Sequence, residues 1–393
     1  MPATPELKAR AAAAVEAARA EIVDLSARIH ANPEPAFEEQ RAAAWVAEAI
    51  ARHGYAVELP AGRLATAVRG RLAGGKGVKG PRIGILAEYD ALPGLGHGCG
   101  HNTMAASGVG AAIALAALRD AFAGEVVFLG TPAEERGSGK QFMLDDGLFD
   151  GLDAALLFHP GDRDMVGSIL LASEDVDVTF TGRAAHAAGE PWEGKNALDA
   201  VVLLLQAVGL WRQQLPQHAR VHGIVVEGGT AANIIPDRAT ARFMIRSTDQ
   251  AYFEAMRERF RALVAGAAMM ADVAGEVVFS GGSTTMKDNP VLAGLWTANM
   301  EAAGRDDEGV DPEHIGSSDM GNVSLVLPTI HPTLAICDHG VPWHSIESRD
   351  AAATPRADET TLLAATLVAQ TALDLLVDPS LVVDAWRAFR GEA

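Results

Sequence analysis

Strand-like and helix-like segments alternate between residues 82 and 158, and this alternation limits the fold more than any other feature of the chain. The strand-like segments are short apolar runs, and the longer helix-like segment is rich in Ala, Leu and Ile. In chain order the segments lie at 82–87, 103–119, 125–129, 138–146 and 153–158. A β-α-β-α-β order is typical of a mostly parallel sheet covered by helices on both faces. We therefore predict an α/β fold for the first part of the chain.

The pattern changes near residue 173, where alternating apolar and polar residues indicate half-exposed strands. Six segments follow in the order β-α-β-β-α-β, and we expect them at 176–181, 197–211, 221–227, 238–246, 249–270 and 276–280. This order is the signature of a split-βαβ, or ferredoxin-like, unit. We predict that residues 173–282 form an inserted second domain. A helix at 289–303, a strand at 332–336 and a helix at 358–376 would then complete the first domain, made of residues 1–172 and 283–393.

The composition of the chain excludes several classes of function. The formal net charge of −19 argues against a nucleic acid or an anionic membrane as partner, because both are bound by basic patches. No segment approaches the roughly 20 apolar residues of a membrane span. Residues 1–28 resemble an amphipathic helix rather than a signal peptide. With only two cysteines, Cys99 and Cys337, we expect a cytoplasmic enzyme rather than a disulfide-bonded secreted protein.

Residues that can bind metals follow the predicted strands one after another. They are Asp90 after the first strand, Cys99 and His101 in a glycine-rich turn before the first helix, Glu134 and Glu135 after the second strand, and His159 after the third. Because the carboxyl ends of parallel strands meet at one edge of a sheet, these side chains should converge there. Thiolate, imidazole and carboxylate groups are the usual zinc ligands, and a carboxylate beside them suits a hydrolase. A thiol nucleophile is the alternative, but the spacing of Cys99 and His101 seldom lets an imidazole reach the sulfur.

Six motifs together resemble those of the two-metal aminoacylase/carboxypeptidase superfamily of metallopeptidases. They are Asp90-Ala91-Leu92-Pro93, Cys99-Gly100-His101-Asn102, Pro132-Ala133-Glu134-Glu135, Gly182-Arg183-Ala184-Ala185-His186-Ala187, the run from Gly228 to Pro236, and Gly316-Ser317-Ser318-Asp319-Met320-Gly321. Within the superfamily the chain is similar to the branch of aminobenzoyl-glutamate, indole-acetyl-amino-acid and β-alanyl-dipeptide hydrolases. Asn102 stands where the auxin-conjugate enzymes usually have Asp, which favours the other two.

The resemblance implies a site with two divalent ions, first of all Zn²⁺, with Mn²⁺, Co²⁺ or Ni²⁺ as alternatives. Its metal ligands fall on Cys99, His101, Glu135, His159 and His344. Glu134 takes the place of the general base, which accepts a proton from a metal-bridged water. Asp90 would orient a ligand, and Asp319 would shape the pocket or bond a ligand histidine. Glu88 holds the place where many relatives outside this branch have a histidine ligand.

The resemblance also assigns roles to the inserted domain. His186 would stabilise the oxyanion, and Asn233 and Arg246 would bind the carboxylate of the substrate. The domain would act as a lid and dimerisation domain, so that His186 reaches the metal site of a partner copy. The implied protein is a homodimeric amidohydrolase that cleaves the amide between an acyl or aminoacyl group and an amino acid with a free carboxylate. A dipeptidase or carboxypeptidase acting on ordinary peptides is the alternative, followed by an inactive binding relative.

Overall fold

A computed structural model describes residues 1–310 and 315–392, and these residues form two compact units. The described residues of the first unit are 1–168, 286–310 and 319–392, and those of the second unit are 169–285 and 315–318. Each unit has its own hydrophobic core. The second unit contains the whole of segment 173–282.

The first unit is built on a six-stranded sheet whose central strands are parallel. Its strands are, in spatial order, β1 (Ala56–Glu58), β2 (Val68–Ala73), β4 (Glu125–Thr131), β3 (Arg82–Glu88), β5 (Ala154–Leu156) and β11 (Thr329–Ile330). Strand β3 is parallel to β4 and β5, and β5 is parallel to β11, whereas β1 and β2 form an antiparallel edge. Almost every residue of β3 and β4 is buried, as expected for strands between two layers. The mostly parallel α/β sheet predicted from the sequence is confirmed.

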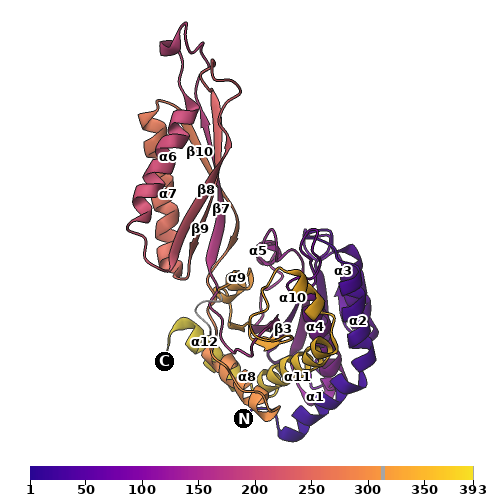
Figure 1. Cartoon of the computed structure of the whole chain (residues 1–393). Coiled ribbons are helices and arrows are strands. Elements are labelled where there is room, and N and C mark those ends of the chain that lie inside the picture. The colour runs from indigo at the N-terminus through magenta and orange to yellow at the C-terminus, as the bar shows by residue number, and fades with distance from the viewer. Residues whose placement is uncertain (311–314, 393) are drawn as a thin grey trace. The chain divides into compact units, whose positions relative to one another are not determined.

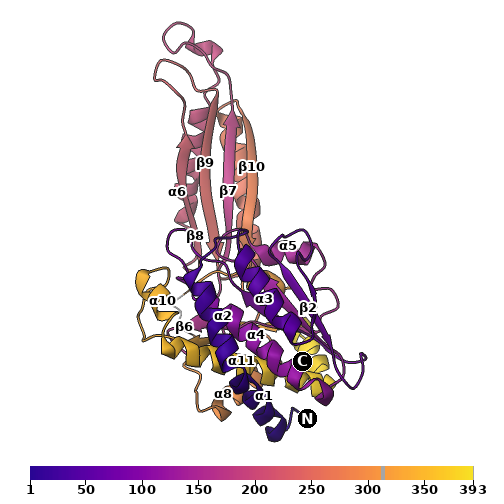
Figure 2. The same cartoon turned by 90° about the vertical axis from the view of Figure 1, so that its right-hand side faces the viewer.

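Helix α4 (His101–Ala117) packs directly on β3 and is the central helix of this unit. Four helices pack against it, namely α1 (Pro5–Ala17), α2 (Arg19–Ala31), α3 (Gln40–Arg52) and α11 (Pro355–Val377) (Figure 1; Figure 2). Gly108 allows α4 to approach the sheet closely, since a Cβ there would lie 2.8 Å from the Cβ of Ala87. Further helices of the unit are α5 (Gly139–Asp145), α8 (Pro290–Ala302), α9 (Met320–Ser324), α10 (Ile346–Ala351) and α12 (Pro379–Arg390).

Some elements of the first unit differ from the sequence-based expectation. Residues 1–28 contain two helices, because Ala18 leaves the helical conformation with φ −95° and ψ 4°. The strand expected at 332–336 is the shorter β12 (Thr333–Ala335), which pairs with β6 (His159–Gly161) in a separate two-stranded sheet. Strand β11 joins the main sheet instead, since Pro332 has no N–H to donate to a continuous ladder. Helices α3 and α12 have no counterpart in the prediction.

Helix α11 corrects the expectation that no segment is long and apolar enough to span a membrane. By length and composition it passes that test, with a mean hydropathy of 1.6 over an 18-residue window. However, 78% of that window is buried inside the structure. Contact with α4 in the core therefore accounts for its apolar composition.

The second unit is a four-stranded antiparallel sheet with two helices on one face (Figure 1). Its elements are, in chain order, β7 (Ala172–Thr181), α6 (Ala197–Arg212), β8 (Ala219–Glu227), β9 (Arg238–Ser247), α7 (Gln250–Met270) and β10 (Ala274–Ser283). The spatial order β10-β7-β9-β8 leaves β10 and β8 at the edges. Alternate residues of β7, including Val176, Val178 and Phe180, are buried in the core, as their period-two pattern predicts. The β-α-β-β-α-β order expected from the sequence is observed.

Candidate functional site

The carboxyl ends of β3, β4 and β5 place acidic and imidazole side chains at one edge of the main sheet. The last residue of β3, Glu88, lies opposite the last residue of β4, Thr131, in the parallel register. The segments that follow these strands therefore begin at the same edge. Asp90, Glu134, Glu135 and His159 all lie in these segments.

Cys99 and His101 join this edge from the start of α4. Gly100 between them has a left-handed φ of 71°, and a Cβ there would lie 2.8 Å from Pro160, so glycine is needed at this turn. His344 arrives from a distant segment immediately before α10. Its Nε2 lies 2.9 Å from the Sγ of Cys99, although 245 residues separate the two in the sequence.

Two overlapping groups of side chains have the geometry to hold metal ions. The first is Cys99, His101 and Glu135 and the second is Glu88, His101 and Glu134, and within each group the ligand atoms lie within 4.8 Å of one another. Nε2 of His101 is 3.3 Å from Oε2 of Glu88 and 3.9 Å from Oε2 of Glu134. Nε2 of His344 is 3.5 Å from Oε2 of Glu135, which adds this histidine to the first group.

His159 lies beside the same cluster. Its ring centroid is 6.0 Å from that of His101 and 6.2 Å from that of Trp343. Its Nδ1 is 2.7 Å from the carbonyl oxygen of Pro160, and this contact places the N–H on Nδ1 and leaves Nε2 as the acceptor nitrogen. Burial and the charges of His331 and His101 lower the pKa of His159 to about 3, so that the ring is neutral, as a metal ligand must be.

Asp90 connects two of the candidate ligands. Its Oδ1 is 3.0 Å from Nδ1 of His101, and its Oδ2 accepts a 2.9 Å hydrogen bond from the backbone N–H of Glu135. Burial alone would lower the pKa of His101, but the hydrogen bond and charge of Asp90 outweigh it and raise that pKa well above its usual range, so that a cation would bind Nε2 in competition with a proton. Asp90 thus lies where a residue that orients a ligand histidine would lie.

The donor set of this cluster fits divalent cations. Nε2 of His101 and Oε2 of Glu88 are buried and face each other at 3.3 Å, but neither forms a hydrogen bond among the described residues, although buried polar atoms normally do. Burial and neighbouring carboxylates raise the pKa values of Cys99 and Glu134 well above their usual ranges. Bound cations would give both atoms a partner and would oppose these pKa shifts. The combination of thiol, imidazole and carboxylate suits zinc better than magnesium or calcium.

Lys140 is a buried residue of this region that the sequence analysis did not single out. Its ammonium group forms ion pairs with Glu88 and Asp319, and its backbone N–H also donates to Asp319. Burial would raise the pKa of Glu88, but the charges of Lys140 and His101 outweigh it and lower that pKa to about 2. Asp319 therefore anchors Lys140 and, through it, Glu88. The sequence signal is weak, because a lysine at the start of a short helix is ordinarily exposed.

His186 and Asn233 of the second unit lie in neighbouring loops beyond the ends of β7 and β9. The N–H of Ala187 donates to the carbonyl of Asn233 at 3.0 Å, which ties the two loops together. Nδ1 of His186 accepts hydrogen bonds from the N–H groups of Ala188 and Gly189 at 3.2 and 3.0 Å. The neutral ring therefore carries its proton on Nε2, the nitrogen that can donate to a ligand.

Arg246 lies at the other end of the same sheet. In the ladder between β7 and β9 it pairs with Ser173, whereas Arg238 pairs with Thr181, eight residues further along β7. Eight residues of strand correspond to about 26 Å at ~3.3 Å per residue. The structure therefore brings His186 and Asn233 together but does not bring Arg246 to them within one copy.

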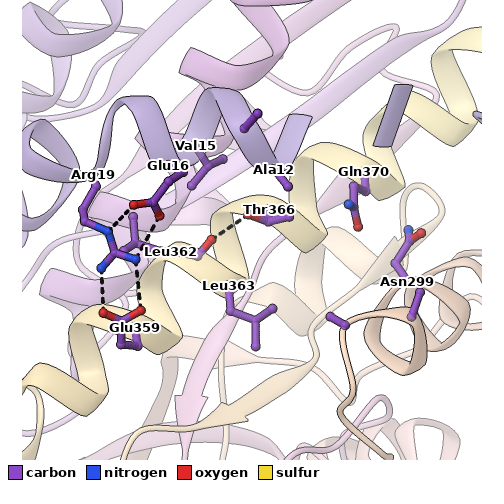
Figure 3. A pocket seen from close by; sticks show the side chains of 13 residues that line it. Ala12, Val15, Glu16, Arg19, Asn299, Glu359, Leu362, Leu363, Thr366 and Gln370 are labelled. Carbon is purple, nitrogen blue, oxygen red and sulfur yellow. Dashed lines mark hydrogen bonds and ion pairs between the residues drawn. The ribbon is translucent and has the colours of Figure 1, made fainter. Parts of the chain in front are cut away.

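A separate surface groove lies between α1, α8 and α11 of the first unit (Figure 3). At one end Arg19 binds Glu16 at 2.8 Å and Glu359 at 2.6 Å. Further along, Asn299 donates to the hydroxyl of Thr371 at 3.1 Å. Because these polar side chains bind one another and none of the candidate residues lines the groove, we assign no site to it.

The chain is similar in sequence to proteins of one peptidase family. The model of peptidase family M20/M25/M40 matches residues 84–372. A mouse protein named Xaa-Arg dipeptidase is 35% identical over 411 aligned residues, which cover 98% of this chain and 92% of that protein. A p-aminobenzoyl-glutamate hydrolase polypeptide from Escherichia coli K12 is 34% identical over 300 residues, which cover 71% of this chain and 62% of that protein.

Solved structures with the same fold are similar over nearly the whole chain. The YXEP protein of Bacillus subtilis, described as a dinuclear metal binding peptidase from the M20 family, has a TM-score of 0.71 at 21% identity, covering 92% of this chain and 99% of that chain. The aminobenzoyl-glutamate utilization protein of Klebsiella pneumoniae has a TM-score of 0.72 at 22% identity, covering 91% and 96%. These similarities extend the fold assignment to both units.

Proposed function

Because this chain belongs to peptidase family M20/M25/M40, we propose that it is a two-metal amidohydrolase that releases an amino acid with a free carboxylate from a dipeptide or an N-acyl amino acid. The observation that carries this proposal is the cluster of Cys99, His101, Glu134, Glu135 and His344 at the carboxyl edge of the sheet. The relatives named dipeptidase and aminobenzoyl-glutamate hydrolase support the same substrate class. We propose zinc as the native metal, with manganese, cobalt or nickel as the alternatives.

The proposed chemistry assigns the ligand role to Cys99, His101, Glu135, His159 and His344. Bound ions would lower the pKa of a water molecule toward neutrality and polarise the scissile carbonyl. Glu134 accepts a proton from this water and passes it to the leaving amine. Oε2 of Glu134 lies 3.9 Å from Nε2 of His101, which places this carboxylate beside the proposed ligands. His186 donates from Nε2 to the developing oxyanion.

We place the homodimer contact at a free edge of the inserted sheet. Among the residues that the structure describes, strand β8 pairs with β9 alone, and Ile224, Val225 and Val226 on it are 63%, 46% and 57% exposed. An apolar edge strand with unpaired N–H and C=O groups favours pairing with a copy of itself about a two-fold axis. Such a contact would give the inserted unit the dimerisation role implied by the sequence resemblance.

The opposite placement of Arg246 and His186 supports a shared active site. A dipeptide spans about 7 Å at ~3.5 Å per residue, which is far less than the length of the sheet between these two residues. One copy therefore cannot offer both side chains to one substrate while its sheet is intact. We propose that Arg246 binds the substrate carboxylate in its own copy, whereas His186 and Asn233 act together on the substrate of the partner copy.

We propose a cytoplasmic location with no nucleic-acid or membrane partner. Cys99 and Cys337 are both free thiols, and a cysteine ligand persists most readily where thiols stay reduced. The net charge of −19 disfavours binding to nucleic acid and anionic lipid.

Removal of metal is expected to abolish hydrolysis and to lower the stability of the first unit. Protein stripped with a chelator should regain activity with zinc or manganese on a panel of dipeptides, N-acyl amino acids and aminobenzoyl-glutamate. When the free metal concentration is about 100 times its Kd, each bound ion should add about 2.7 kcal/mol to the free energy of unfolding. Elemental analysis and denaturant titration of the same sample measure both effects. Full activity in a demonstrably metal-free sample would contradict the proposal.

Mixing inactive variants is expected to show which residues act in trans. Mixed dimers of His186→Ala with Glu134→Gln, or with Arg246→Ala, should each contain one intact site, so that random exchange restores about a quarter of the parent activity. A mixture of His186→Ala with Asn233→Ala should stay inactive. In a mixed dimer each active site receives both loops from one partner copy, and that copy carries a substitution at either residue 186 or residue 233. If subunit exchange is verified and the first two mixtures also stay inactive, His186 acts in its own copy.

A further inference from the structure

Glu39 is a fully buried acid that the proposed mechanism does not use. It lies between α2 and α3, and its exposed fraction is 0%. Its Oε1 accepts hydrogen bonds from the backbone N–H of Ala133 at 2.9 Å and from that of Phe37 at 2.8 Å. Its Oε2 accepts a hydrogen bond from the hydroxyl of Thr66 at 2.8 Å. The carboxyl group of Glu39 thus joins the loop of residues 34–39 to Ala133, the residue immediately before Glu134.

Ala133 has a backbone conformation that requires support. Its φ is 60°, in the left-handed region that residues with a side chain seldom adopt. Glu39 binds its N–H, and the N–H of Gly139 donates to its carbonyl at 3.2 Å. The turn is tight, since a Cβ on Gly139 would lie 1.8 Å from the carbonyl oxygen of Pro132. The direction in which the chain leaves Ala133 determines where the side chain of Glu134 lies.

The loop that carries Glu39 also contacts the other segments that follow the central strands. The N–H of Ala91, next to Asp90, donates to the carbonyl of Glu34 at 2.9 Å. The ring of Phe37 covers Gly137, where a Cβ would lie 2.5 Å from a ring carbon. These contacts make loop 34–39 a brace across two segments of the site.

We propose that Glu39 is a positioning residue, which holds Ala133 in the left-handed conformation and thereby directs Glu134 toward the attacking water. This inference rests on the proposed role of Glu134 as the base. Glu135 has its own anchor, because Asp90 accepts its backbone N–H. Loss of Glu39 should therefore disturb the base more than the metal ligand.

The protonation state of Glu39 does not remove this contact. Burial raises the pKa of Glu39 to about 7, against the hydrogen bonds that it accepts. Oε1 accepts both backbone N–H groups whether or not Oε2 carries a proton. Glu39→Gln, which keeps an amide oxygen for these N–H groups, is therefore a conservative variant.

Glu39→Ala is expected to lower kcat by about 10²-fold, the loss that a displacement of about 1 Å can cause, with metal content and KM little changed. Glu39→Gln should stay within a few-fold of the parent. Glu38→Ala removes the exposed neighbouring acid and should have no effect. Glycine adopts a left-handed φ without support. The double variant Glu39→Ala with Ala133→Gly should therefore have a kcat about tenfold higher than that of Glu39→Ala alone.

Three outcomes would overturn the positioning role: parental kcat in Glu39→Ala, loss of bound metal together with kcat, or no recovery in the Ala133→Gly background. If Glu39→Ala does not fold, Glu39→Asp is compared in both backgrounds, because it keeps the charge but is one methylene too short to reach Ala133. Glu134→Gln, measured alongside, separates the two proposals. If it keeps turnover, the assignment of the base is wrong, whereas an inactive Glu134→Gln beside a fully active Glu39→Ala overturns only the positioning role.

Discussion

Glu134→Gln should retain its bound metal and lose about 10²–10⁴-fold in kcat, the usual contribution of a positioned general base. Glutamine has nearly the same shape as glutamate but cannot accept the proton of the attacking water. Glu134 has the right surroundings for this role, because its carboxylate lies 3.9 Å from Nε2 of His101 and is largely shielded from solvent. Steady-state kinetics and elemental analysis on one preparation test both parts of the prediction.

Glu135→Gln is the matched control, since the two residues are adjacent and chemically identical. Glu135 belongs to the first candidate metal-binding group with Cys99 and His344, so its substitution should release metal before it affects anything else. Turnover of Glu134→Gln within threefold of the parent would remove it from the role of base. If Glu134→Gln loses its metal and Glu135→Gln keeps it, then Glu134 is the metal ligand and Glu135 is the base.

Local sequence patterns predicted the scaffold because they report burial directly. The continuous apolar runs of β3 and β4 and the alternating pattern of β7 each indicate one kind of strand environment. Once the strands are parallel, residues that follow them must meet at one edge, which explains why Cys99, His101 and the Glu134–Glu135 pair could be grouped from spacing alone. Short elements were harder, because β11 has two residues and β12 has three.

Contacts between distant segments could not be predicted in this way. His344 joins Cys99 across 245 residues, and only the resemblance pointed to it. Lys140 reaches Asp319 across 179 residues, and Glu39 reaches Ala133 across 94. Lysine and glutamate are mostly exposed in proteins, so composition and periodicity favour the surface for both. Their burial becomes visible only when the partners that neutralise or bind them are placed beside them.

Lys140→Met is expected to lower the free energy of unfolding by about 3–5 kcal/mol, the usual cost of leaving a buried charge without its partner. The substitution keeps an aliphatic side chain of similar length but leaves the carboxylates of Glu88 and Asp319 buried without the ammonium. The effect should be larger than that of any single exposed ion pair, which contributes about 0–1 kcal/mol. Denaturant unfolding of metal-stripped parent and variant measures it without a contribution from bound ions.

The pH dependence of this loss identifies its electrostatic origin. In the parent the pKa of Glu88 is about 2, below its ordinary value of 4.5, so its ion pair stabilises the fold fully above pH 4.5 and that contribution disappears as the pH falls toward 2. The difference between parent and Lys140→Met should therefore be largest above pH 4.5 and should shrink on acidification. A neutral triple variant, Lys140→Met with Glu88→Gln and Asp319→Asn, should recover more than half of the lost stability because no unpaired charge remains. A loss of stability that is independent of pH and persists in the triple variant would indicate that Lys140 contributes through packing of its aliphatic chain instead.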